Sequence, residues 1–75
     1  MSGDARMDDL RQVFASNLRR IRHEKGLSQD ELARKADMDR SYLSRLENGA
    51  NSPGLEIIGR LATVLRCEPA ELLKQ

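Results

Sequence analysis

The segment SQDELARKADMDRSYLSRLENG, residues 28–49, contains two short helical patterns separated by only a few residues. At its start, Ser28 and Glu31 have the S-x-x-E spacing of a capping box, in which each side chain accepts a hydrogen bond from a backbone amide at a helix N-terminus. The spacing predicts a helix that begins at Ser28 and lasts about two turns. Its expected inner face consists of three apolar residues: Leu32, Ala33 and Ala36.

A second helix is predicted over residues 40–47 or 40–48. Asp39 precedes it and is a good N-cap residue, while Gly49 follows it and readily adopts the left-handed conformation that ends a helix. About three residues separate this helix from the one before it. Two short helices with such a tight connection, packed among other helices, form the helix-turn-helix unit, which places its second helix in the major groove of DNA.

The second helix is unexpectedly polar for a small domain that needs its helices to build a core. At about 100° per residue, Leu43 and Leu46 fall on one side of this helix, with Tyr42 at the edge. Five polar residues share the opposite side: Arg40, Ser41, Ser44, Arg45 and Asn48. No carboxylate lies between the two arginines on this side. Arginine can donate two hydrogen bonds to guanine, and serine or asparagine can reach other base edges or phosphate. An ordinary solvated face is the alternative, but such faces usually mix Lys and Glu four residues apart, so we favour a DNA-facing surface.

The flanking sequence predicts three more helices. One stripe of apolar residues, at positions 10, 13, 14, 18 and 21, indicates a first helix over residues 10–25 that ends at Gly26. Another stripe marks a fourth helix: Leu55, Ile58, Leu61, Ala62 and Leu65. A last, short helix begins with Pro69, a residue favoured at the first helical position, and points Leu72 and Leu73 inward.

The fold class that these patterns predict is all-α, a compact bundle of five helices that contains a helix-turn-helix. A chain of 75 residues has room for one small core, so we expect one DNA-binding domain over residues 10–75. Residues 1–9 are expected to form an N-terminal extension, either a disordered acidic tail or an added turn of the first helix. No alternation of apolar and polar residues indicates a strand.

Composition excludes several classes of protein. The longest apolar run is far shorter than the roughly 20 residues needed to cross a bilayer, so no membrane association is expected. A single cysteine, Cys67, and no recognisable secretory signal favour a reducing, cytoplasmic location. With one histidine, His23, and no phosphate-binding loop, the chain lacks the groups for catalysis, so we expect no enzyme, no cofactor and no metal site.

The charge distribution adds little. The net charge is only +1, although residues 10–52 carry nine Lys or Arg against six Asp or Glu. This local excess lies where the polar helix lies, but ordinary solvated helix faces explain it equally well.

Residues 14–73 resemble the Cro and phage-repressor family of helix-turn-helix regulators, often called Xre-like. Three elements carry the resemblance in this order: Gly-Leu-Ser-Gln, Glu-Leu-Ala and Leu-Glu-Asn-Gly. The resemblance implies a DNA-binding domain whose base-reading positions are Arg40, Ser41, Ser44 and Arg45. Two departures are Arg66, where many members have Gly, and Cys67, where Val is common.

The resemblance also assigns supporting roles. Gln29 is expected to lie against the DNA backbone and to brace the helix predicted over residues 40–48. The full set of implied backbone contacts is Ser28, Gln29, Tyr42, Asn48, Asn51 and Ser52. An ion pair is implied between Arg22 and Glu47, and a partner is physically required if Glu47 is shielded, because an unpaired buried carboxylate is costly.

We therefore predict a sequence-specific regulator of transcription that binds double-stranded DNA, as a homodimeric repressor or autoregulator. Its dimer interface is expected on the fourth and fifth helices, at Leu65, Leu72, Leu73 and their neighbours. The alternative is an antitoxin or a restriction-modification controller in which binding of a partner protein is central, because the fold does not separate these functions. A purely structural helical bundle is a third interpretation.

Overall fold

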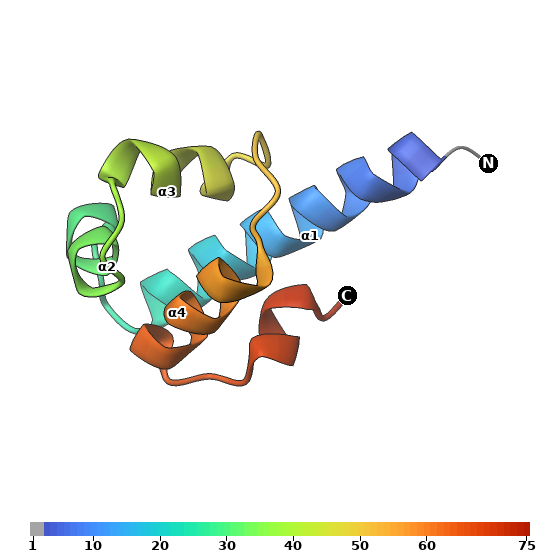
Figure 1. Ribbon diagram of the computed structural model, residues 1–75. Helices are drawn as coiled ribbons and strands as arrows, with labels where there is room; N and C mark the ends of the chain where they lie inside the picture. The colour runs from blue at the N-terminus through green and yellow to red at the C-terminus, as the bar shows by residue number, and fades with distance from the viewer. Residues whose placement is uncertain (1–2) are drawn as a thin grey trace.

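A computed structural model describes the backbone of residues 3–75 and the side chains from residue 9 onward. These residues form four α-helices and one 3₁₀ helix, without a strand among them. The elements in chain order are α1 (Gly3–Glu24), α2 (Gln29–Lys35), α3 (Arg40–Glu47), α4 (Leu55–Leu65) and η1 (Pro69–Leu73). Figure 1 shows α3 and the loop after it along one edge of the molecule, with η1 on the opposite side.

Helix α1 is longer than its apolar stripe predicts. It begins at Gly3 rather than Leu10, and its first turns project beyond the other helices (Figure 1). The predicted extension over residues 1–9 is thus helical from Gly3, and its first two residues lie outside the described part of the chain. The end of α1 agrees with expectation, because the helix stops at Glu24 and Gly26 has a left-handed φ of 71°.

The fifth predicted helix is a 3₁₀ helix, so the predicted bundle of five helices is confirmed only as four α-helices. The Glu71 amide donates to the Glu68 carbonyl at 2.9 Å, the i to i+3 pattern of a 3₁₀ turn. Asn17 of α1 donates to the carbonyls of Leu72 and Lys74 at 3.0 and 2.9 Å. The last carbonyls of this segment are therefore satisfied by a side chain rather than by a further turn of helix.

The core lies between α1 and the other helices, and every helix contributes to it. Its large side chains are almost all aliphatic: Phe14, Leu18, Ile21, Leu32, Leu43, Leu46, Ile58, Leu61, Leu65 and Leu72. The predicted inner face of α2 is confirmed, since Leu32, Ala33 and Ala36 are buried. Leu43 and Leu46 hold α3 to this core, as the helical wheel predicts.

The predicted dimer interface needs a correction. Leu65 and Leu72 are fully buried within the monomer, so neither can contact a second copy. Of the three leucines proposed for that role, Leu73 alone is exposed. The apolar periodicity marked all three as buried, but it could not distinguish burial within the chain from burial between chains.

Two helix ends differ in detail from expectation. Asp39 is the N-cap residue of α3, but its side chain makes no capping hydrogen bond. Arg66 ends α4 in the left-handed conformation, with φ of 55°, so it adopts the backbone geometry usually left to glycine.

Across residues 3–75, no helix combines the length and the apolar character that a bilayer-spanning segment needs.

Candidate nucleic-acid interface

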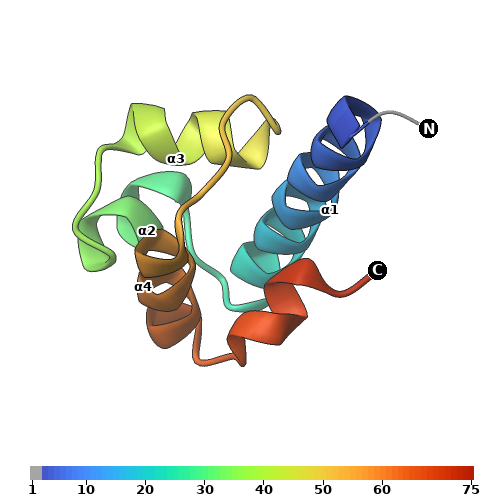
Figure 2. The same cartoon turned by 45° about the vertical axis from the view of Figure 1, so that its right-hand side comes forward.

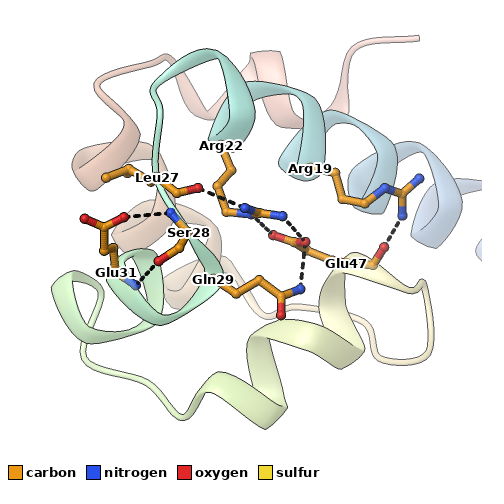
Figure 3. Close-up of polar contacts among 7 residues, drawn as sticks. All are labelled: Arg19, Arg22, Leu27, Ser28, Gln29, Glu31 and Glu47. Atoms are coloured by element: carbon orange, nitrogen blue, oxygen red, sulfur yellow. Dashed lines mark hydrogen bonds and ion pairs between the residues drawn. The ribbon is translucent and has the colours of Figure 1, made fainter.

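The start of α2 is fixed by the predicted capping box. Ser28 Oγ accepts from the Glu31 amide at 3.1 Å, and the Ser28 amide donates to Glu31 Oε1 at 2.8 Å (Figure 3). The Glu31 carboxylate accepts the hydrogen bond from the Ser28 amide, and this bond lowers the pKa of Glu31 because it favours the charged form. The capping box is confirmed, and it sets where Gln29 and Asp30, the first residues of α2, emerge.

The connection between α2 and α3 is held from behind by α4. Asp37 adopts a left-handed φ of 57°, which turns the chain sharply between the two helices. Arg60 of α4 donates to the Asp37 carbonyl at 3.0 Å and pairs with Glu56 at 2.9 Å. The turn between α2 and α3 is therefore also held by a contact from outside the helix-turn-helix. Figure 2 shows the two helices meeting at this turn, with α4 below them.

The inner face of α3 contains a buried carboxylate with a full set of donors. Glu47 is 1% exposed, and its Oε2 lies 2.6 Å from Arg22 Nε while its Oε1 lies 3.0 Å from Arg22 Nη2. Gln29 Nε2 also donates to Oε1 at 3.0 Å (Figure 3). The structure thus contains the ion pair that the resemblance implies, and the residue expected to brace α3 contacts the same carboxylate.

Arg22 has a further bond that completes this arrangement. Its Nη1 donates to the Leu27 carbonyl at 2.9 Å. A buried guanidinium with unsatisfied donors would be costly, so this bond reduces the cost of burying the pair.

Arg19 also contacts α3, although its role was not predicted from the sequence. Its Nη1 donates to the backbone carbonyl of Glu47, at the C-terminal end of α3 (Figure 3). A cation at a helix C-terminus interacts favourably with the helix dipole and satisfies a carbonyl that lacks a partner within the helix. The available signal was the spacing of three residues from Arg22, which places both arginines on one side of α1.

The outer face of α3 is open to solvent, in contrast to its inner face. Five polar residues were predicted on this face from the helical period. Ser44 is half-buried, and the other four are exposed: Arg40, Ser41, Arg45 and Asn48. The Arg45 guanidinium lies 5.9 Å from the centroid of the Tyr42 ring, a cation–π distance. Tyr42 is half-buried against the core, so it offers a fixed platform for this flexible arginine.

Arg40 has a partner that was not predicted from the sequence. Its Nε lies 3.3 Å from Oδ1 of Asp30, in the first turn of α2. Both side chains are well exposed, 65% for Arg40 and 77% for Asp30. The pair therefore links the two helices of the helix-turn-helix across their solvent side.

The loop after α3 is anchored on α1. Gly49 has a left-handed φ of 75°, and a Cβ atom there would lie 2.4 Å from Nε2 of Gln12. Arg11 Nη1 lies 3.4 Å from Ser52 Oγ, a long hydrogen bond between α1 and the loop. Asn51 is half-buried and Ser52 is exposed. The loop residues expected to contact DNA thus lie at the surface, on the same edge of the molecule as α3 (Figure 1).

Two further features of the described residues concern metal binding and thiol chemistry. Among them, no three His, Cys, Asp or Glu side chains gather closely enough to hold a metal ion. Cys67 is a half-buried free thiol whose pKa is raised by burial, which disfavours the reactive thiolate.

Comparison with known proteins assigns this arrangement to a family. The family model described as "Helix-turn-helix" matches residues 18–72, which include α2, α3, α4 and most of η1. The chain belongs to this family, the Cro and phage-repressor-like (Xre-like) helix-turn-helix transcriptional regulators.

Individual relatives are similar over most of their length. An uncharacterized HTH-type transcriptional regulator of Sinorhizobium fredii is 37% identical over 65 residues, which cover 87% of this chain and 84% of that protein. The restriction-modification controller protein C.AhdI from Aeromonas hydrophila is 44% identical, with a TM-score of 0.80 over 83% of this chain and 94% of that one. The controller C.Esp1396I, solved as a tetramer in complex with its natural 35 base-pair operator, is 26% identical, with a TM-score of 0.74 over 87% and 96%.

Proposed function

We propose that this regulator recognises specific sequences of double-stranded DNA by inserting α3 into the major groove, as a homodimeric repressor or autoregulator of transcription. The observation that supports this most directly is the contrast between the two faces of α3. Leu43, Leu46 and Glu47 are no more than 1% exposed, whereas the two arginines and Ser41 on the other face are exposed. A helix held by one face and open on the other is what insertion into a groove requires.

Base reading is assigned to four residues of this outer face. Arg40 and Arg45 can each donate two hydrogen bonds to the O6 and N7 acceptors of guanine. Ser41 and Ser44 are short side chains that can contact several base edges at close approach. The Tyr42 ring under Arg45 limits the directions in which that guanidinium can point, which favours a specific contact over a diffuse one.

Contacts to the DNA backbone are assigned to residues on both sides of α3. The Ser28 hydroxyl accepts from the Glu31 amide, which leaves its own hydrogen to donate to phosphate. Gln29 Nε2 uses one hydrogen on Glu47, and its second hydrogen remains for phosphate. Further donors to sugar and phosphate are Tyr42, Asn48, Asn51 and Ser52.

Dimerisation is proposed through α4 and η1, with a contribution from α1. Leu55, at the start of α4, is 87% exposed, and Leu10 and Leu73 are each 42% exposed. Leu10 and Leu73 also line an apolar groove with Phe14, Pro53 and Ile58. A dimer is proposed because two half-sites about one turn of DNA apart require two α3 helices. Sedimentation should therefore give a dimer that Leu55→Asp converts to monomer; an unchanged dimer would move the interface elsewhere.

The test of DNA reading is selection of duplexes from a random pool, followed by binding titrations at several salt concentrations. Arg45→Ala should weaken binding to the selected duplex by about 1–3 kcal/mol and relax the preference at one base position. If Arg45→Ala weakened binding to all sequences equally, Arg45 would be reassigned to the backbone. A protein without preference for any duplex would refute the proposed function.

Gln29→Ala is the matched variant for a backbone contact. It should weaken binding to all sequences to a similar degree and leave the base preferences unchanged. Gln29 also contacts Glu47, so the thermal stability of the Gln29→Ala variant is measured alongside its DNA affinity. This measurement distinguishes a loss of folding from the loss of a phosphate contact.

A second candidate is a controller of a restriction-modification system, favoured by the 44% identity with C.AhdI. An antitoxin with a protein partner is the related possibility. In either case the location would be cytoplasmic, as the lone Cys67 suggests. A selected operator that lies in the promoter of a neighbouring restriction-endonuclease or toxin gene would support this role, and an operator distant from any such gene would argue against it.

A further inference from the structure

The ion pair between Asp30 and Arg40 is an unexpected feature for a DNA-binding surface. Asp30 places a carboxylate in the first turn of α2, next to the face of α3 that is proposed to approach a polyanion. An exposed pair of this kind contributes little to stability, because water screens both charges. The role of Asp30 is therefore better sought in DNA binding than in folding.

The geometry of the pair limits what Arg40 can bind. The carboxylate contacts Nε, at 3.3 Å, which leaves the two terminal nitrogens of the guanidinium to donate to O6 and N7 of guanine. A phosphate that approaches Arg40 has to compete with Asp30 for the positive charge and is repelled by the carboxylate. Guanine is neutral, so it can accept from the terminal nitrogens while the ion pair stays in place.

We propose that Asp30 is a specificity-determining residue, which holds Arg40 for guanine and lowers its affinity for phosphate. This inference rests on the proposed function. Binding to unspecific DNA depends almost entirely on neutralised phosphates, whereas specific binding adds contacts to base edges. Asp30 therefore weakens unspecific binding more than specific binding.

The experiment compares Asp30→Asn with the wild-type protein on the selected duplex and on a scrambled duplex of the same composition. Asp30→Asn should bind the scrambled duplex about five- to tenfold more tightly and the selected duplex with a change of less than about twofold. The salt dependence on the scrambled duplex should steepen by about 0.9 in the slope of log K against log salt, the value for one more neutralised phosphate. Asp37→Asn, which makes the same charge change in the turn, serves as the control and should alter both duplexes alike.

A double variant tests whether the effect passes through Arg40. In an Arg40→Gln background, Asp30→Asn should no longer change the ratio of the two affinities, because the guanidinium that Asp30 holds is gone. An equal gain on both duplexes, or an unchanged effect in the Arg40→Gln background, would overturn the role of Asp30. If the wild-type protein itself bound both duplexes equally, the proposed function would fail, and the specificity role with it.

Discussion

Two arginine–carboxylate pairs involve residues of α3, and they lie in opposite environments. On the inner face, the side chains of Arg22 and Glu47 are 10% and 2% exposed, and both residues have additional hydrogen bonds. On the outer face, Arg40 and Asp30 are exposed to water and connected by one contact at 3.3 Å. The same chemical pair therefore has two different consequences. The buried pair fixes where the helix lies, and the exposed pair is proposed to govern how Arg40 meets DNA.

Burial decides which of the two pairs matters for folding. In the interior, removal of one partner leaves a charge without water or counter-charge, which costs far more than the intact pair contributes. At the surface, water replaces a lost partner at once. The pairs should thus differ by several kcal/mol when one member is deleted.

The largest expected effect is that of Glu47→Ala. This change leaves the buried Arg22 guanidinium without its carboxylate and should lower the free energy of unfolding by about 3–5 kcal/mol. Arg45→Ala, on the outer face of the same helix, should change it by less than about 0.5 kcal/mol. Urea denaturation of both variants makes the measurement, and equal midpoints would remove the idea of a stabilising buried pair.

A smaller effect is expected at Gly49, which tests whether the loop contributes to holding α3. Gly49→Ala forces a left-handed alanine and brings a Cβ atom within 2.4 Å of the Gln12 side chain. Gly26→Ala is a matched control, since its φ of 71° is nearly the same and no atom lies within 4 Å of the added Cβ. Each should cost about 1–2 kcal/mol for the backbone. Gly49→Ala should cost little more than Gly26→Ala, because the added Cβ meets only the end of the exposed Gln12 side chain, which can turn aside. A much larger loss at Gly49 would mean that Gln12 is held in place and that its contact with the loop stabilises the fold.

The exposed pair should have a still smaller effect on stability. Asp30→Asn removes the carboxylate from Arg40 and from the first turn of α2, and should lower the free energy of unfolding by less than about 1 kcal/mol. Thermal unfolding at low and high salt checks this, because screening should reduce even this small loss. A loss comparable to that of Glu47→Ala would show that exposure is not what separates the two pairs.

The smallest effect is a pH dependence at Glu31, a third carboxylate near the interface. Its pKa is lowered in the folded state by the hydrogen bond from the Ser28 amide. A lowered pKa stabilises the fold fully above the unfolded value, and this stability is lost as the pH falls through the folded value. Unfolding midpoints measured from neutral to acidic pH should fall less steeply for Glu31→Gln than for the wild-type protein. Parallel curves would exclude this contribution.

Much of the fold could be predicted because its signals are local. The capping box of Ser28 and Glu31 identified the start of α2, and the two leucines of α3 identified its inner face. The start of α1 was not predicted, since between Gly3 and Leu10 a single large apolar residue, Met7, continues the apolar stripe. The 3₁₀ helix also depends on a distant residue, Asn17, that no local pattern reveals.

The candidate site divides in the same way. The outer face of α3 follows from the 3.6-residue period alone, so its exposed residues could be named in advance. The contact between Asp30 and Arg40 depends on the angle at which α2 crosses α3, and the bond from Arg19 depends on how α1 meets the end of α3. Neither angle is encoded in a short stretch of sequence.

Glu47 has a consequence for the DNA as well as for the protein. Its partners come from two other helices, Arg22 from α1 and Gln29 from α2, so the three helices are tied together as one body (Figure 3). A rigid DNA-binding surface of this kind loses little conformational entropy on binding, because it is already assembled in the free protein. The adjustment needed for a close fit then falls on the duplex, and operators that bend easily should be preferred even at base pairs the protein never touches.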